Sequence, residues 1–124
     1  MIKTKDLRRG NWVTSGKGDF PMYVTAIFEG EVYLNFEGNE GDVWESKEED
    51  LKPIPLTPEV LENIGFFVDN NKAHIVYNEF GNIYQLNRVG ESFQSTYLAT
   101  EIPYLHTLQN HYYFSTNTEL TYKP

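Results

Sequence analysis

Residues 22–36, MYVTAIFEGEVYLNF, contain two apolar segments separated by the dipeptide EG at 29–30. A two-residue turn of this kind between two such segments predicts a β-hairpin. In the second segment Val32, Leu34 and Phe36 alternate with more polar positions, which is the period of a half-buried antiparallel strand. This stretch therefore predicts an antiparallel sheet in the first half of the chain.

Further short strands are expected on both sides of this hairpin. They are NWVT at 11–14, VWES at 43–46 and LKPI at 51–54. Five short strands within about 45 residues, with turns between them, favour a small SH3-like β-barrel or a strongly bent sheet.

The apolar period changes at residues 55–66, PLTPEVLENIGF. Thr57 is a good N-cap, Pro58 suits the first helical position, and Gly65 suits the left-handed conformation after a helix. These signals predict a short helix over about 58–64.

The rest of the chain predicts an antiparallel meander followed by a helix. Turn residues separate three candidate strands at 73–77, 83–89 and 92–99, and a helix is expected over 105–115 with Asn117 as its C-cap. The fold class is α+β: an N-terminal small barrel or bent sheet, a short helix, a meander, and a C-terminal helix docked on the sheet. We expect one domain, 1–124, within which 1–55 and 56–124 can form subdomains.

The predicted C-terminal helix has an apolar stripe formed by Leu105, Leu108 and Tyr112. Phe114 falls on the opposite side, so either the helix is packed on two sides or Phe114 is an exposed anchor for a partner. One polar cluster is also expected on this helix, either bonding it to the sheet or lining a small-ligand pocket: His106, Gln109, Asn110 and Tyr113.

Charge is unevenly distributed along the chain, whose net charge is −8. Residues 29–50 hold nine acids against the single base Lys47, which suggests either a solvated rim or an acidic face for a basic partner. The candidate partner-binding residues are Glu37, Glu40, Asp42, Trp44, Glu45, Glu48, Glu49, Asp50 and Phe114, with Trp12 and Tyr33 as further aromatic anchors.

Five of the ten bases lie in the first seventeen residues. Together with one tryptophan they form a candidate nucleic-acid patch: Lys3, Lys5, Arg8, Arg9, Trp12 and Lys17. The negative net charge argues against nucleic-acid binding by the chain overall.

The sequence contains no recognised arrangement of catalytic or metal-binding residues. There is no cysteine, and SGKGD at 15–19 lacks the spacing of a phosphate-binding loop. His106 and His111 are five apart, whereas two ligands on one helix face need a spacing of three or four. We therefore expect no catalytic residue, metal or cofactor, and a protein that is not an enzyme. With no apolar segment long enough for a signal peptide or a membrane span, we expect a cytoplasmic location.

Three motifs together resemble a family of small uncharacterised proteins encoded by Bacteroidetes and their phages. They are LRRGNWV at 7–13, PIPLTPEVLENIGF at 53–66 and YLHTLQNHYYFSTNTEL at 104–120. Asn117 stands where that family usually has Gly, which suits a C-cap, and His111 stands where it usually has an apolar residue. The resemblance implies a bacterial or phage origin and no particular activity.

The function expected from the sequence is a non-catalytic module that binds a protein partner and has an acidic hairpin face at 29–50. One alternative is a small barrel that binds nucleic acid through the basic and aromatic N-terminal patch. Another is a phage inhibitor that blocks a basic host protein with its acidic face. The oligomeric state is left open.

Overall fold

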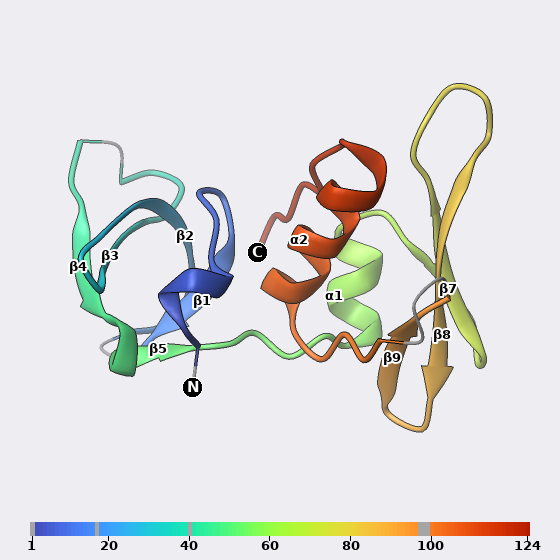
Figure 1. Cartoon of the computed structure of the whole chain (residues 1–124), viewed down its shortest axis with the longest axis horizontal. Helices are drawn as coiled ribbons and strands as arrows, with labels where there is room; N and C mark the ends of the chain where they lie inside the picture. Colours follow the sequence, from blue (N-terminus) through green and yellow to red (C-terminus); the bar gives the residue numbers. More distant parts are fainter. Residues whose placement is uncertain (1, 17, 40, 97–99) are drawn as a thin grey trace. The chain divides into compact units, whose positions relative to one another are not determined.

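The computed structural model describes residues 2–16, 18–39, 41–96 and 100–124 (Figure 1). The chain divides into two compact units, residues 1–54 and 55–124, at a position one residue from the subdomain boundary suggested by the sequence. No helix within the described residues is long and apolar enough to cross a membrane.

Unit 1, residues 1–54, is a curled antiparallel sheet of five strands in the order β4-β3-β2-β1-β5. Its strands are β1 (Trp12–Ser15), β2 (Gly18–Phe28), β3 (Glu31–Asn35), β4 (Trp44–Lys47) and β5 (Leu51–Lys52). Two short 3-10 helices, η1 (Thr4–Asp6) and η2 (Glu48–Asp50), were not predicted from the sequence. The five predicted strands and the bent sheet are confirmed.

The central hairpin of unit 1 has the turn predicted for it. Glu29 and Gly30 both have positive φ, 48° and 81°, and Phe28 pairs with Glu31 across the turn. Two consecutive positive φ values give the backbone twist that matches two antiparallel strands, and glycine adopts one of them without steric cost. The turn sets the register of Ala26–Phe28 against β3, and an irregularity between Val24 and Ala26 shifts the pairing by one residue beyond that point.

The inner face of the curled sheet carries the core of unit 1. The buried members of this core are Ile2, Leu7, Val13, Met22, Val24, Val32, Leu34 and Leu51. Phe20, Phe36 and Trp44 pack against it and meet one another edge to face, with ring centroids 5.1–6.0 Å apart. Edge-to-face contacts of this kind stabilise a core beyond the apolar area that they bury.

Unit 2, residues 55–124, combines a four-stranded antiparallel sheet with two helices. The sheet order is β6-β7-β8-β9, and the elements are α1 (Pro58–Asn63), β6 (Phe67–Val68), β7 (Lys72–Val76), β8 (Ile83–Val89), β9 (Ser92–Ser95) and α2 (Leu105–Thr116). The meander and both helices are confirmed, whereas β6 was not predicted. Of the strand expected over 92–99, residues 97–99 lie outside the described residues.

Helix α1 begins and ends at the predicted signals. The Thr57 hydroxyl accepts a hydrogen bond from the Val60 amide at 3.2 Å, and Pro58 occupies the first turn. Gly65 has φ of 103°, and a Cβ at this position would lie 3.4 Å from the Ile75 side chain. The left-handed backbone conformation, rather than lack of space, is therefore the reason that glycine suits this position.

Helix α2 buries the predicted stripe. Leu105 and Leu108 are fully buried, and the Tyr112 ring contacts those of Tyr84 and Phe66, with centroids 5.1 and 6.5 Å apart. The helix ends at Asn117, which has φ of 56° and whose amide bonds to the Tyr113 carbonyl at 2.8 Å. Asparagine tolerates the left-handed conformation better than most residues, so it can replace glycine here.

Candidate functional site

The C-terminal half of α2 and the end of the β7–β8 hairpin enclose a pocket of about 430 Å³ in unit 2. Its lining consists of Tyr77, Ile83, Tyr84, His111, Phe114, Ser115 and Thr116. The helix contributes His111, Phe114, Ser115 and Thr116, of which the second and third share one side with His111 because they are three and four residues from it. The stripe at 105, 108 and 112 is buried in the core of unit 2. The side of the helix that carries 111, 114 and 115 faces the pocket instead.

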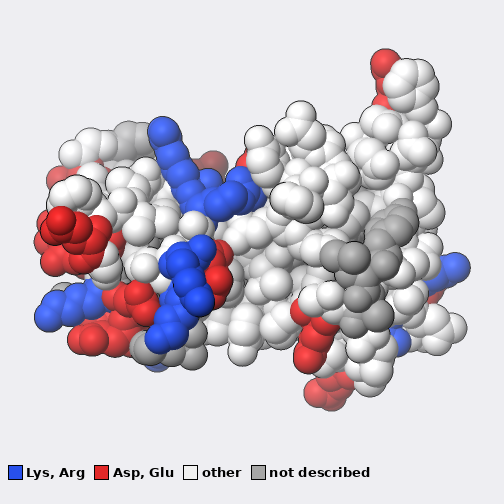
Figure 2. Space-filling view, viewed as in Figure 1, with Lys and Arg blue, Asp and Glu red and all other residues white. Residues whose placement is uncertain are grey.

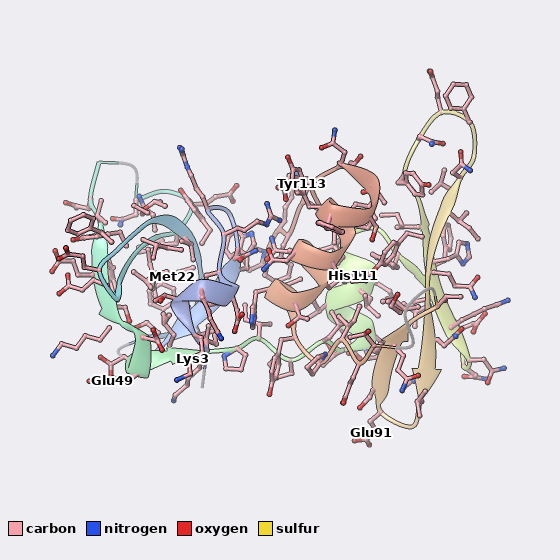
Figure 3. The ribbon with its side chains drawn as sticks, viewed as in Figure 1. Lys3, Met22, Glu49, Glu91, His111 and Tyr113 are labelled. Atoms are coloured by element: carbon pink, nitrogen blue, oxygen red, sulfur yellow. The ribbon has the colours of Figure 1, made fainter. Side chains whose placement is uncertain are left out.

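His111, labelled in Figure 3, forms a polar contact with Tyr84 in the pocket wall. The Tyr84 hydroxyl and His111 Nδ1 share a hydrogen bond, and the two rings meet edge to face with centroids 5.7 Å apart. His111 Nε2 is buried and has no hydrogen bond with the described residues. Burial lowers the pKa of His111, since the charged imidazolium would lose hydration there.

This arrangement determines the chemistry that His111 can offer. One ring nitrogen is bonded to Tyr84, and the other is screened from water. A general base must reach the proton that it accepts, directly or through a water molecule. The contact with Tyr84 therefore holds the His111 ring in the pocket wall, and in this structure neither ring nitrogen is presented to a substrate.

Phe114 stands at the rim of the pocket. Its side chain is 91% exposed, so the alternative in which both sides of α2 are packed is wrong at this position. A large apolar side chain with so little cover is a candidate contact for another molecule. Of the two alternatives left by the sequence, the exposed position is the one observed.

The predicted polar cluster on α2 does not form this pocket. His106 and Gln109 are 6% and 2% exposed, whereas Asn110 is half-buried and Tyr113 is exposed. His106 stacks on Tyr104 with centroids 5.8 Å apart and an interplanar angle of 8°. None of the four lines the pocket near Phe114, and their role in bonding the helix to the sheet stays a prediction.

The acidic segment lies on β3, β4, η2 and the connections around them. Register places Tyr33 opposite Glu45 and Glu31 opposite Lys47 on the outer face of the sheet. Desolvation, followed by the charges of Glu45 and Glu31, raises the pKa of Tyr33. This small face is therefore electronegative, although Lys47 lies within it.

The candidate partner-binding residues of unit 1 differ in how they are placed. Glu37, Asp42, Glu45 and Glu49 are exposed, and Glu40 lies outside the described residues. Trp44, Glu48 and Asp50 are half-buried, and the Trp44 ring packs on the core of the unit. Trp44 is therefore mainly a structural residue.

Glu48 connects the acidic segment to the basic N-terminus. Its carboxylate accepts hydrogen bonds from the Thr4 amide at 3.3 Å and hydroxyl at 3.1 Å, and it lies 3.8 Å from Lys3 Nζ. Part of the predicted nucleic-acid patch is thus neutralised within unit 1. Figure 2 shows both signs of charge intermixed over this unit.

The remaining patch residues differ in exposure. Lys5 and Arg9 are exposed, and Arg8 is half-buried. Trp12 is half-buried against the Tyr23 ring, with centroids 5.3 Å apart, and Lys17 lies outside the described residues. Unit 1 as a whole contains eleven acids and seven bases, a net charge of −4.

A second pocket in unit 2, of about 390 Å³, lies beside α1 and β9. Arg88 is placed over the Phe93 ring at 5.8 Å from its centroid, and both line this pocket together with the carboxylates Glu59 and Glu91. The opposite charges at its wall distinguish it from the pocket near Phe114. Among the described residues, no group of three or more His, Asp or Glu side chains is placed to hold a metal ion.

The pairing of Tyr84 with His111 could not be found from the sequence. The two residues are 27 positions apart, and the alternation of β8 predicts only that Tyr84 faces inward. Neither protein-family models nor curated proteins nor solved structures gave a match to this chain. The function of the protein is therefore inferred from the geometry of the site.

Proposed function

We propose that the chain is a non-catalytic protein-binding module and that its partner contacts the surface formed by the end of α2 and the adjoining hairpin. The observation that carries this proposal is Phe114, a 91% exposed aromatic ring at the rim of a pocket. Aromatic residues beside pockets are typical anchors of protein interfaces.

The charge of α2 supports the same surface. The helix contains no Asp, Glu, Lys or Arg, and Figure 2 shows mostly uncharged atoms over it. The centre of a protein interface is depleted of charged residues, because burying an unpaired charge is costly. An uncharged helix in a chain of net charge −8 meets that requirement.

Site-specific crosslinking tests the proposal. A photoreactive phenylalanine analogue at position 114 should crosslink to a partner in host lysate, and the variant Phe114→Ser should lose the same partner in a pull-down. Phe67→Ser is the matched control. Phe67 is another exposed phenylalanine of unit 2, with 73% of its surface exposed, but its ring stacks on His74. Equal capture by both variants would contradict the proposal.

The acidic face of unit 1 is a second candidate, favoured by the placement of Tyr33 between Glu31 and Glu45. This face would bind a basic partner. If the protein is a phage inhibitor, that partner would be a basic host protein. The double substitution Glu31→Gln, Glu45→Gln should weaken salt-sensitive binding to polylysine, whereas Glu59→Gln, Glu62→Gln on α1 should not. Equal losses would mean that only net charge matters.

Nucleic-acid binding through the N-terminal patch stays a prediction. The pairing of Lys3 with Glu48 weakens the case for it. Neutralisation of phosphate charge by free cations provides most of non-specific affinity, and a paired lysine contributes less. A gel shift at low salt that Arg9→Gln abolishes would support it against the protein-binding proposal.

A further inference from the structure

The pocket near Phe114 has a lining that selects for one kind of ligand chemistry. Four of its seven lining residues are rings: Tyr77, Tyr84, His111 and Phe114. Ile83 adds an aliphatic wall. Aromatic rings pair with one another edge to face or in offset stacks. Such pairs add a favourable free energy beyond that of the apolar area they bury.

No Asp, Glu, Lys or Arg is among the described residues of this lining. The imidazole of His111 is kept neutral near pH 7 by its burial. A charged ligand would lose hydration on entering and would find no opposite charge in return. The lining therefore complements an uncharged group.

The polar groups of the pocket are few, and some of them are bonded already. His111 Nδ1 is bonded to Tyr84, and the Thr116 hydroxyl donates to the Tyr112 carbonyl at 2.7 Å. The Ser115 hydroxyl is exposed and can exchange a hydrogen bond with a ligand. A volume of about 430 Å³ is near the lower end for ligand pockets, which suits a single ring system.

We propose that this pocket binds an uncharged aromatic ring, supplied by a Phe, Tyr or Trp side chain in an uncharged segment of the partner protein. This inference rests on the proposed function, because it names what the partner would insert beside Phe114. Ring-on-ring contact would supply the affinity, and the rim hydroxyl of Ser115 would bond a polar edge such as an indole N–H.

A titration of the full chain followed by amide NMR tests the pocket without any partner. The probes are N-acetyl-tryptophanamide, N-acetyl-leucinamide and N-acetyl-lysinamide. We expect saturable shifts with the tryptophan probe, confined to the lining residues and their neighbours, and binding weaker by about tenfold for leucine, a difference of about 1.4 kcal/mol. The lysine probe should give no saturable shift.

Two variants on one strand provide the matched control. Ile83 and Val89 are both exposed apolar residues of β8, but only Ile83 lines the pocket. Ile83→Asp should abolish the shifts caused by the tryptophan probe, and Val89→Asp should leave them within about twofold, less than 0.5 kcal/mol. If Ile83→Asp does not fold, the comparison of the three probes on the unchanged protein still decides.

The possible outcomes separate the two proposals. Equal binding of the three probes, or none, would overturn the aromatic pocket, while crosslinking at position 114 could still support a protein partner. If the tryptophan probe binds but position 114 gives no crosslink, the aromatic pocket is supported and the proposal of a protein-binding module is contradicted. If the same amides shift when the protein concentration alone is raised, the pocket binds a second copy of this chain. That result would overturn the proposal of a separate partner protein.

Discussion

At the residue scale, the hydrogen bond between Tyr84 and His111 is the contact that sequence reasoning missed. It joins β8 to α2 at a pocket wall, and it requires a ring on each element. A hydrogen bond between neutral groups contributes about 0.5–1.5 kcal/mol to stability.

Tyr84→Phe should therefore lower the free energy of unfolding by about 0.5–1.5 kcal/mol, measured by urea denaturation. The ring stays in place, so the loss reports the hydroxyl together with the His111 Nδ1 that its removal leaves unpaired. Tyr23→Phe serves as control, because the Tyr23 hydroxyl makes no hydrogen bond with the described residues, and should change stability little. A loss as large in the control would contradict the role of the Tyr84 hydroxyl.

His111 should make the stability of the protein depend on pH. Its pKa is lowered by burial in the folded state, so between that value and the unfolded value of about 6.5 the unfolded chain binds more protons. The contribution of the neutral imidazole is complete above about pH 6.5 and is lost as the pH falls through this interval. Unfolding experiments at pH 7.5 and 5.0 should show a smaller difference for His111→Gln than for the unchanged protein. Parallel curves would contradict this account.

At the scale of elements, the helix ends and the hairpin turn are placed by single residues. Thr57 and Gly65 bound α1, Asn117 ends α2, and Glu29-Gly30 turns the β2–β3 hairpin. Each of these is a local signal, which is why it could be identified from the sequence.

The end of α2 provides a matched pair of substitutions. Asn117 has φ of 56°, a conformation that costs a residue with a Cβ about 1–2 kcal/mol. Asn117→Gly should keep or raise the melting temperature, whereas Asn117→Ala should destabilise unit 2 by about 1 kcal/mol. Thermal unfolding of the three proteins side by side measures both. An alanine variant as stable as the glycine variant would show that the helix end relaxes.

Elements that depend on long-range contacts were predicted less well. Strand β6 is two residues long and exists because Phe67 and Val68 pair with His74 and Ala73. The helix η2 leads from β4 into β5, and its first residue bonds to the N-terminal segment 44 positions away. The N-terminal patch was predicted from basic and aromatic residues close in sequence, and the pairing of Lys3 with the distant Glu48 was not part of that prediction. Local periodicity carries no information on such partners.

The resemblance motifs can be explained by the positions that their residues occupy in the fold. Leu7, Asn11 and Val13 of the first motif are buried, and the Asn11 side chain accepts a hydrogen bond from the Arg8 amide at 2.6 Å. Leu108 and Gln109 of the third motif are also buried. These residues maintain the structure, which is why the motifs could predict elements and could not identify a partner.

At the scale of the whole molecule, each of the two units has its own buried apolar residues and its own sheet. Charge is also shared equally, since residues 55–124 contain seven acids and three bases and therefore also carry −4. The charge of −8 in the acidic segment is thus reduced by half, to −4, by the other charged residues of the same unit.

Core substitutions should reveal whether the units unfold separately. Leu34→Ala in unit 1 and Leu108→Ala in unit 2 each remove a fully buried side chain and should cost about 2–5 kcal/mol. We expect each to weaken the hydrogen-exchange protection of its own unit and to leave the slowest amides of the other unchanged. Equal loss of protection across both units would show a single cooperative transition.

The absence of charge on α2 has a consequence for handling the protein in solution. The chain has an isoelectric point of about 4.8, where mutual repulsion between molecules vanishes. Acidic residues elsewhere lose their charge on the way to that pH, but the helix surface around Phe114 has none to lose. Colloidal stability should therefore be lowest in mildly acidic buffers, where charge elsewhere on the chain no longer keeps the exposed Phe114 ring of one molecule away from another.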